Sequence, residues 1–215
     1  LLITAGIIIG TINMTGISIT FSQLIVQWSG ANLLLALLLV TGASLLLGMG
    51  LPVTAAYIMI AILTVPALTS MGVSLLAAHM IIFWLSQDSN VTPPVCLAAF
   101  AASSISGSRP MATGFTSWKL AKGLYIMPLL FAYTGLINGE WSERLIIFVF
   151  ALVGLFALTV GFSGYLFGAL NIPMRIIIFV SAVAIFWPDT LWLNIFGVFS
   201  LFSIGIHNRR ALSRH

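Results

Sequence analysis

Two consecutive prolines break an apolar stretch at Asp88-Ser89-Asn90-Val91-Thr92-Pro93-Pro94. Because proline has no backbone N–H, the carbonyls of Ser89 and Asn90 lose the donors that a helix would give them. Each proline also disfavours the α conformation of the residue before it. We therefore expect a helix to unwind here, with bare carbonyls beside the side-chain oxygens of Ser89, Asn90 and Thr92.

The apolar stretches on the two sides of this break are short. Residues 73–87 make 15 residues before it, and residues 95–104 make 10 after it. A transmembrane helix needs about 20 apolar residues. The two stretches together therefore predict one span with a break in it, over about 73–104. A water-exposed loop between two separate helices is the alternative interpretation.

The composition of the whole chain is that of an integral membrane protein. Of the 215 residues, 60% are hydrophobic and only 6% are charged, whereas soluble proteins carry about 25% charged residues. No Asp, Glu, Lys or Arg precedes Asp88. This excludes cytosolic enzymes, secreted modules and disordered chains, and it predicts an all-α polytopic membrane protein. The single cysteine, Cys96, can form no disulfide within the chain.

A second break lies at Gly48-Met49-Gly50-Leu51-Pro52, between apolar segments of about 32–48 and 53–69. Each segment rises only about 25 Å, against a hydrocarbon core of about 30 Å. No charge anchors the tip in water, so we expect a re-entrant hairpin over about 32–69 whose tip ends inside the protein. Two ordinary short spans are the alternative. Pro52 removes the donor for the Gly48 carbonyl, and the helix N-terminus after it favours a carboxylate.

Two interrupted helices in one small membrane protein are typical of the binding site of a secondary transporter. Freed carbonyls and neutral side-chain oxygens suit a hard cation of low charge such as sodium. The candidate sodium ligands are accordingly Gly48, Ser89, Asn90 and Thr92. No Walker-type phosphate loop occurs, and no ATP site is predicted.

Two ionisable residues are weaker candidates. Asp88 is either an intramembrane proton or sodium site or a residue at the wet end of the break. His79 is a lone histidine on an apolar helix, where a packed, hydrogen-bonded role is commoner than proton transfer. The sequons at Asn13 and Asn90 fall at membrane depth and are discounted as glycosylation sites.

The charges also predict an orientation. If the segments at about 118–137, 145–169, 175–187 and 190–206 each cross once, seven of the eight basic residues fall on one side and only Arg144 on the other. Glu140, Glu143 and Asp189 lie opposite the basic side. The positive-inside rule then places residues 105–122 and the tail 207–215 in the cytoplasm. The basic residues are few and lie near segment ends, so they indicate the orientation of the chain in the membrane and not a surface that binds nucleic acid.

Several motifs resemble the large membrane subunit of tripartite ATP-independent periplasmic (TRAP) transporters, in the C-terminal half of its fused-permease, DctM-like or TAXI-type subgroup. The hairpin motif is residues 47–57, and the unwound helix that follows it is similar to Thr92-Pro93-Pro94-Val95. The downstream loop is similar to residues 106–120, and the stretch around Asn13 to an upstream segment of that subgroup. The resemblance covers about 1–137.

The resemblance implies sodium-driven uptake of organic acids by an elevator-type permease, and not an enzyme or a cofactor-dependent protein. It implies that residues 1–137 form the second of two inverted repeats and that 138–215 form extra C-terminal transmembrane helices. The implied partners are a periplasmic substrate-binding protein, the preceding repeat, and a small membrane subunit or fused domain. The implied location is the inner membrane of a bacterium or archaeon. The implied ion and substrate surface comprises Gly48, Met49, Gly50, Pro52, Ser89, Asn90, Thr92, Pro93 and Pro94, with Asn13 as a further candidate.

Other functions stay open from the residues alone. A proton- or cation-coupled exchanger would use Asp88 and His79. A membrane-embedded enzyme would need clustered nucleophile, base and acid groups, and only His79, Asp88 and Ser89 approach such a set. A non-transporting scaffold subunit is a third alternative. The chain opens Leu1-Leu2-Ile3 without a Met, and we expect an upstream segment.

Overall fold

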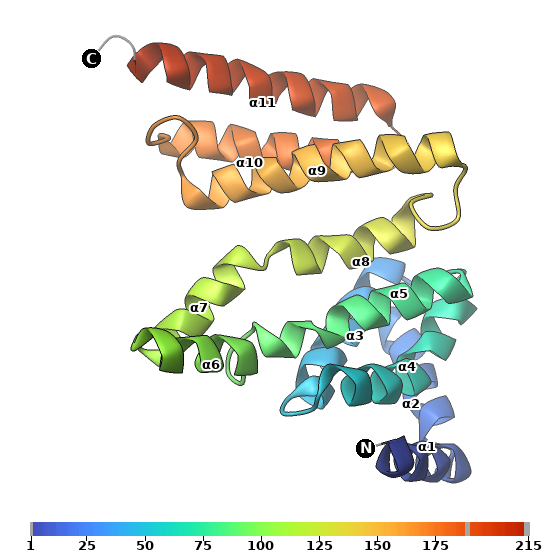
Figure 1. Ribbon diagram of the computed structural model, residues 1–215. Helices are drawn as coiled ribbons and strands as arrows, with labels where there is room; N and C mark the ends of the chain where they lie inside the picture. Colours follow the sequence, from blue (N-terminus) through green and yellow to red (C-terminus); the bar gives the residue numbers. More distant parts are fainter. Residues whose placement is uncertain (1, 188–189, 213–215) are drawn as a thin grey trace. The chain divides into compact units, whose positions relative to one another are not determined.

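A computed structural model describes residues 2–187 and 190–212. Within these residues the chain is helical, with no β-strand and only an isolated bridge between Tyr165 and Ala169. The prediction of an all-α protein is confirmed. The chain divides into two compact units (Figure 1), one ending at Ala132 and the other beginning at Tyr133.

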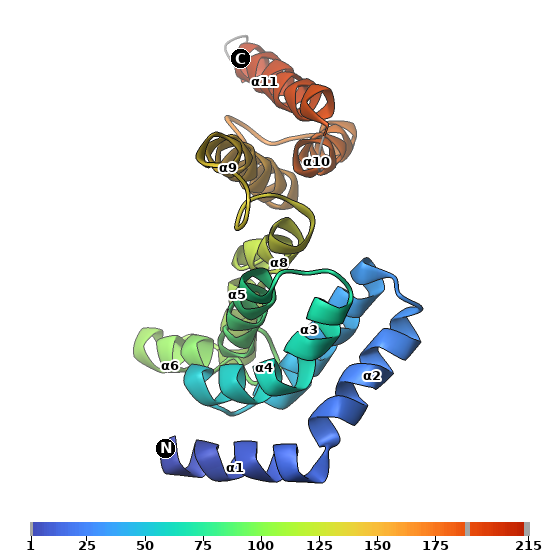
Figure 2. The same ribbon diagram turned by 90° about the vertical axis from the view of Figure 1, so that its right-hand side faces the viewer.

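A sharp bend separates the first two helices of unit 1. Helix α1 spans Leu2–Thr15 and α2 spans Ile17–Ser29, and they meet at an angle of 68°, as Figure 2 shows. The bend falls at Gly16, whose φ of 69° is a conformation that glycine adopts without steric cost. The first apolar segment of the chain is thus interrupted at Gly16.

Helices α3 (Leu33–Gly48) and α4 (Val53–Ser70) coincide with the two predicted segments of the hairpin. The Asn32 side chain caps α3 by accepting a hydrogen bond from Leu35 N at 3.2 Å. Helix α4 is the centre of unit 1, because α2, α3 and α5 all pack against it. Whether the hairpin is re-entrant in the membrane stays a prediction.

The broken helix consists of α5 (Leu75–Ser86), a short 3-10 turn η1 (Asp88–Asn90) and α6 (Leu97–Ser106). The non-helical gap therefore reaches from the end of η1 to Cys96, and the Pro93–Pro94 peptide bond within it is cis. The break predicted from the two prolines is present, although α6 begins two residues later than expected.

The sequence prediction fails in the next segment. The polar residues of 106–117 predict a loop, but α7 spans Pro110–Leu120. A turn at residues 121–122 divides the helix expected at 118–137. Helix α8 is only Gly123–Tyr133. Pro110 is the first residue of α7, where the missing N–H has no partner to lose and the fixed φ favours the helix. Proline here starts a helix instead of preventing one.

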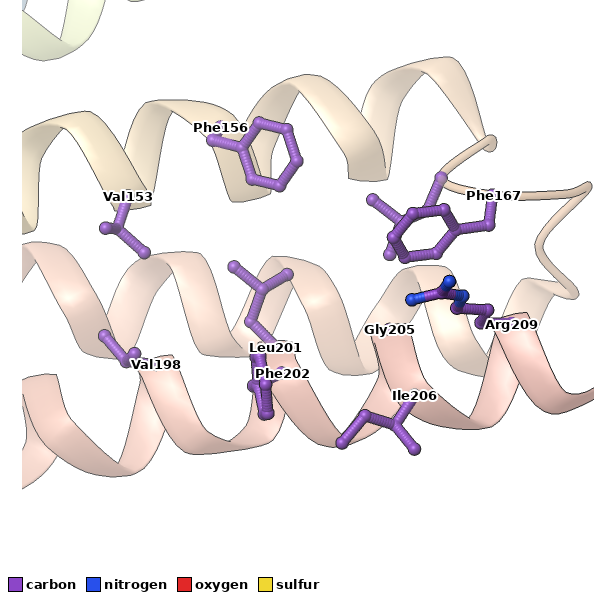
Figure 3. A pocket seen from close by; sticks show the side chains of 10 residues that line it. Val153, Phe156, Phe167, Val198, Leu201, Phe202, Gly205, Ile206 and Arg209 are labelled. Atoms are coloured by element: carbon purple, nitrogen blue, oxygen red, sulfur yellow. The ribbon is translucent and has the colours of Figure 1, made fainter.

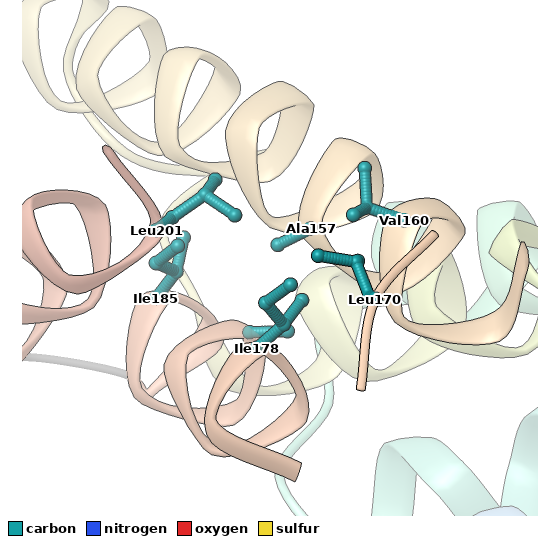
Figure 4. Packing of buried hydrophobic residues seen from close by; sticks show 7 residues of the cluster. Ala157, Val160, Leu170, Ile178, Ile185 and Leu201 are labelled. Carbon is teal, nitrogen blue, oxygen red and sulfur yellow. The ribbon is translucent and has the colours of Figure 1, made fainter. Parts of the chain in front are cut away.

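Unit 2 consists of α9 (Trp141–Ser163), α10 (Ile172–Phe186) and α11 (Leu191–Leu212). Helix α10 packs against both of the others. Figure 4 shows the buried core between them, made of Ala157, Val160, Leu170, Ile178, Ala182, Ile185 and Leu201.

The largest differences from the prediction in unit 2 are at the ends of two helices. Helix α9 ends at Ser163, not at 169, because residues 164–171 form a turn in which Leu170 N donates to Gly164 O at 2.8 Å. Helix α11 continues through residues that were expected to be a tail. The predicted positions of Asp189 and Arg214 lie outside the described residues.

Among the residues that the structure describes, three helices are long and apolar enough to cross a membrane: α4, α9 and the part of α11 up to Arg209. The bent α1–α2 pair makes a fourth if it is one span. Helices α3, α6 and α10 are apolar but shorter. Together with the composition, these helices make the chain an integral membrane protein.

Candidate functional site

The end of α3 meets the turn of the broken helix. Gly48, the last residue of α3, is buried, and a methyl group at this position would lie 3.4 Å from both Cβ and Oγ of Ser89. Helix α3 also contacts η1 as a whole. The hairpin tip and the proline break, 41 residues apart in the sequence, thus form one site.

Asp88 is a buried carboxylate in this site. The residue is only 1% exposed. Its Oδ1 accepts a hydrogen bond from Thr92 Oγ1 at 2.5 Å, whereas Oδ2 is buried without a hydrogen-bond partner. A buried charge without a partner is costly. The free oxygen therefore offers a place for a cation or a proton.

The backbone of the break supplies further oxygens. Among the described residues, no N–H donates to the carbonyls of Ser89 and Asn90, as the two prolines predict. The Gly48 carbonyl is different, because Leu51 N donates to it at 3.2 Å. The expectation of a bare Gly48 carbonyl is wrong. The turn at the tip replaces the donor that Pro52 removes.

Thr92 belongs to a hydrogen-bonded chain of side chains. Its Oγ1 lies 3.0 Å from the hydroxyl of Tyr125, and Trp118 Nε1 donates to the same hydroxyl at 3.1 Å. Helices α7 and α8 thereby reach the break through one side chain each. The Thr92 hydroxyl is already engaged by Asp88 and Tyr125, which makes it a positioning group as much as a candidate ion ligand.

The sequence reading missed this contribution. Neither Trp118 nor Tyr125 is among the site residues that the sequence predicts. A tyrosine inside an apolar helix needs a partner for its hydroxyl, and that was the available signal. The partner of the Tyr125 hydroxyl depends on how α8 packs against the break. No local sequence pattern predicts this packing.

The other tip residues face outward. Gly50 has a φ of 78°, which permits the tight turn, while Met49 and Pro52 are exposed. A cavity of about 270 Å³ lies beside them, between α1 and the start of α4. Its lining is apolar apart from Thr4 and includes Ile8, Leu51, Pro52 and Ala55. The N-terminus of α4 lies at this cavity.

Two of the remaining candidates, His79 and Asn13, do not join the site. His79 Nδ1 lies 2.9 Å from the Tyr57 hydroxyl, so the ring is a hydrogen-bonded packing residue about two turns before the end of α5. Asn13 is exposed on α1, which packs mainly on α2 and α4. The turn with Pro93 and Pro94 packs on α7, since a methyl group on Gly114 would lie 3.6 Å from Pro93.

The chemistry of the donor set is that of oxygen alone. In the part of the chain that the structure describes, no three His, Cys, Asp or Glu side chains gather as a metal site. One carboxylate, two carbonyls and the hydroxyl of Ser89 match the oxygen ligands of a hard cation. They do not match the nitrogen and sulfur ligands that a structural zinc site needs.

Comparison with known proteins gives one result. Residues 1–138 match the family model described as "Tripartite ATP-independent periplasmic transporter, DctM component". This region contains all of unit 1, with both the hairpin and the broken helix. No curated protein and no solved structure matches the chain.

Proposed function

Because the chain belongs to the DctM component family of tripartite ATP-independent periplasmic transporters, it is a permease component, and we propose that it couples the uptake of organic acids to sodium. The observation that carries the proposal is the close approach of Gly48 to Ser89. A methyl group built on Gly48 would lie 3.4 Å from Cβ and Oγ of Ser89. This contact joins two interrupted helices, which is the arrangement that secondary transporters use to bind ion and substrate.

The sodium ion is held at the break. Its ligands are the carbonyls of Ser89 and Asn90 and the Ser89 hydroxyl, with Asp88 Oδ2 as the charged ligand. The support is that both carbonyls and Oδ2 have no hydrogen-bond donor among the described residues. Thr92 positions the carboxylate through its 2.5 Å hydrogen bond to Oδ1.

The substrate carboxylate binds at the N-terminus of α4. The first amides of a helix have no acceptor within the helix, and the helix dipole favours an anion there. The apolar cavity beside Pro52 and Ala55 suits the carbon skeleton of an organic acid. A periplasmic binding protein delivers the substrate, and the preceding repeat completes the site from the other side.

Uptake into proteoliposomes tests the sodium site. The complete permease is reconstituted with its binding protein, and the uptake of radiolabelled acid is measured against sodium concentration. Ser89→Ala removes one oxygen, and we expect the apparent sodium affinity to fall roughly tenfold, or ~1.4 kcal/mol. Ser104→Ala is the matched control, because that hydroxyl is exposed and bonds only to its own helix at Phe100 O, 3.1 Å away. Equal sodium dependence in both variants would place the ion elsewhere.

A proton-coupled exchanger is the second candidate, and the unpartnered Asp88 Oδ2 supports it. The exchanger was expected to use His79 as well as Asp88, and the His79 ring is hydrogen-bonded to the Tyr57 hydroxyl. Asp88→Asn distinguishes the two functions. Loss of sodium-dependent uptake supports the sodium site. The exchanger is supported by two results together. Uptake by the unmutated protein needs a pH gradient but no sodium, and Asp88→Asn abolishes this uptake.

A further inference from the structure

A groove runs along unit 2, outside the region of the hairpin and the broken helix. Helices α9 and α11 both pack on α10 but make few contacts with each other. The space between them has a volume of about 390 Å³, within the range of about 300–1,000 Å³ for ligand pockets. Val153 and Phe156 form one wall, Leu201 and Phe202 the other, and Phe167 closes one end (Figure 3).

The length of the groove equals the depth of one leaflet. It extends along α11 from Val198 to Arg209, a rise over 11 residue steps that, at 1.5 Å per step, is about 16 Å. Half of a hydrocarbon core of about 30 Å is about 15 Å. An acyl chain that starts at the headgroup level beside Arg209 would therefore end near the bilayer centre beside Val198.

Arg209 is the only charged residue that lines the groove, within the part of the chain that the structure describes. Figure 3 places its guanidinium beside Phe167, at the closed end. Arg175 is committed elsewhere, because its Nε donates to Gly161 O at 3.0 Å and its Nη2 to Phe162 O at 3.3 Å. Arg209 is thus the residue that offers its charge to a ligand in the groove.

The closed end of the groove is built and held by side chains. Asn208 is 6% exposed, and its Oδ1 accepts hydrogen bonds from Phe167 N at 3.2 Å and from Gly168 N at 3.0 Å. This ties the α9–α10 turn to α11 at the residue before Arg209. The backbone that carries Phe167 is therefore held beside the part of α11 that carries Arg209.

We propose that this groove binds one anionic phospholipid of the surrounding bilayer. The acyl chain lies between α9 and α11, and the phosphate pairs with Arg209, since guanidinium groups bind phosphate with two parallel hydrogen bonds. A basic residue at the headgroup end of a groove between transmembrane helices is the arrangement that recognises anionic headgroups. The site is independent of the sodium and substrate site proposed above.

Native mass spectrometry of the delipidated 215-residue chain in detergent tests the proposal. The protein is titrated with phosphatidylglycerol and, separately, with phosphatidylcholine of the same acyl chains. We expect the unmutated chain to retain one phosphatidylglycerol more tightly than phosphatidylcholine. Arg209→Gln should weaken phosphatidylglycerol binding about fivefold, corresponding to ~1 kcal/mol for one basic residue, and leave phosphatidylcholine unchanged. Arg109→Gln, in unit 1, is the control and should change neither.

A second variant tests the apolar part of the groove. A methyl group on Gly205 would lie 3.5 Å from Leu166 Cδ2, so Gly205→Leu projects its side chain into the groove and should weaken both lipids. If Gly205→Leu does not fold, Arg209→Gln decides alone, because Arg209 is exposed. Equal binding of the two lipids to the unmutated chain overturns the proposal. The proposal is also overturned if Arg209→Gln binds phosphatidylglycerol as tightly as the unmutated chain does. It is overturned as well if a second copy of the chain, and not a lipid, occupies the groove.

Discussion

Cys96 and Gly114 fit against each other where α7 packs on the end of the proline break. Cys96 is fully buried and has a φ of 26°, which is unusual for a residue other than glycine. A methyl group on Gly114 would lie 2.6 Å from Cys96 Sγ. The thiol therefore occupies the space that the glycine leaves. This contact fixes the shape of the turn that carries the candidate ion ligands.

The contact predicts a compensating pair of substitutions. Gly114→Ala should lower the free energy of unfolding by ~1–3 kcal/mol, because a well-packed site has no room for the added carbon. Cys96→Ala in the same chain should recover part of this loss, since it removes the clashing sulfur. Thermal unfolding in detergent of the two single variants and the double variant measures the coupling. Strictly additive losses would show that the two residues do not touch.

At the site, the sequence predicts which groups can bind an ion, but it does not predict which residues contact one another. Two prolines are enough to predict that Ser89 and Asn90 have carbonyls without backbone donors, because this follows from covalent structure. The same reasoning fails at Gly48, where a turn supplies the N–H of Leu51. The approach of Gly48 to Ser89 and the bond from Thr92 to Tyr125 depend on tertiary packing, which leaves no periodic signal in the chain.

At the scale of elements, hydropathy predicts long apolar helices well and mixed segments poorly. Helices α3, α4, α5 and α10 fall within a few residues of their expected positions, because each is a continuous apolar run between glycine, proline or polar residues. The first part of helix α7 contains the polar residues Thr113 and Ser117, and residues 106–117 were therefore expected to be a loop. Its polar residues do not prevent a helix, and Pro110 begins one.

A close crossing of α10 and α11 gives an element-scale prediction. A methyl group on Gly197 would lie 2.7 Å from Ser181 O and 2.7 Å from Ile185 Cγ1. Because a backbone carbonyl cannot move aside as a side-chain end can, Gly197→Ala should separate the helices and cost ~1–3 kcal/mol. Thermal unfolding of the purified chain measures the loss.

Gly42→Ala is the matched control for this crossing. Gly42 is an exposed glycine inside α3 with no atom within 4 Å of its methyl position. Alanine there should be neutral or stabilise the protein by up to ~1 kcal/mol, because it favours the helix. If Gly197→Ala were as stable as Gly42→Ala, α10 and α11 would not cross as closely as described.

For the whole molecule, the family match and the two units divide the chain at nearly the same place. The match ends at residue 138, and unit 2 begins at Tyr133. Unit 2 contains two of the helices long enough to span a membrane, α9 and α11. That residues 138–215 are additional transmembrane helices stays a prediction, and the orientation that it implies depends on the charges at the helix ends.

The orientation is testable by cysteine labelling on a Cys96→Ala background. Glu140 and Glu143 lie at the start of α9, and Arg175 lies near the start of α10, while Arg209 lies near the end of α11. The positive-inside rule puts the basic ends in the cytoplasm. A membrane-impermeant maleimide added to intact cells should therefore label Ser142→Cys and spare Ser108→Cys and His207→Cys, all three of which are exposed. All three should react after the membrane is permeabilised, which controls for accessibility. Labelling of His207→Cys in intact cells would show that the orientation is the reverse of the predicted one. It would also move the Arg209 end of the lipid groove to the periplasmic leaflet.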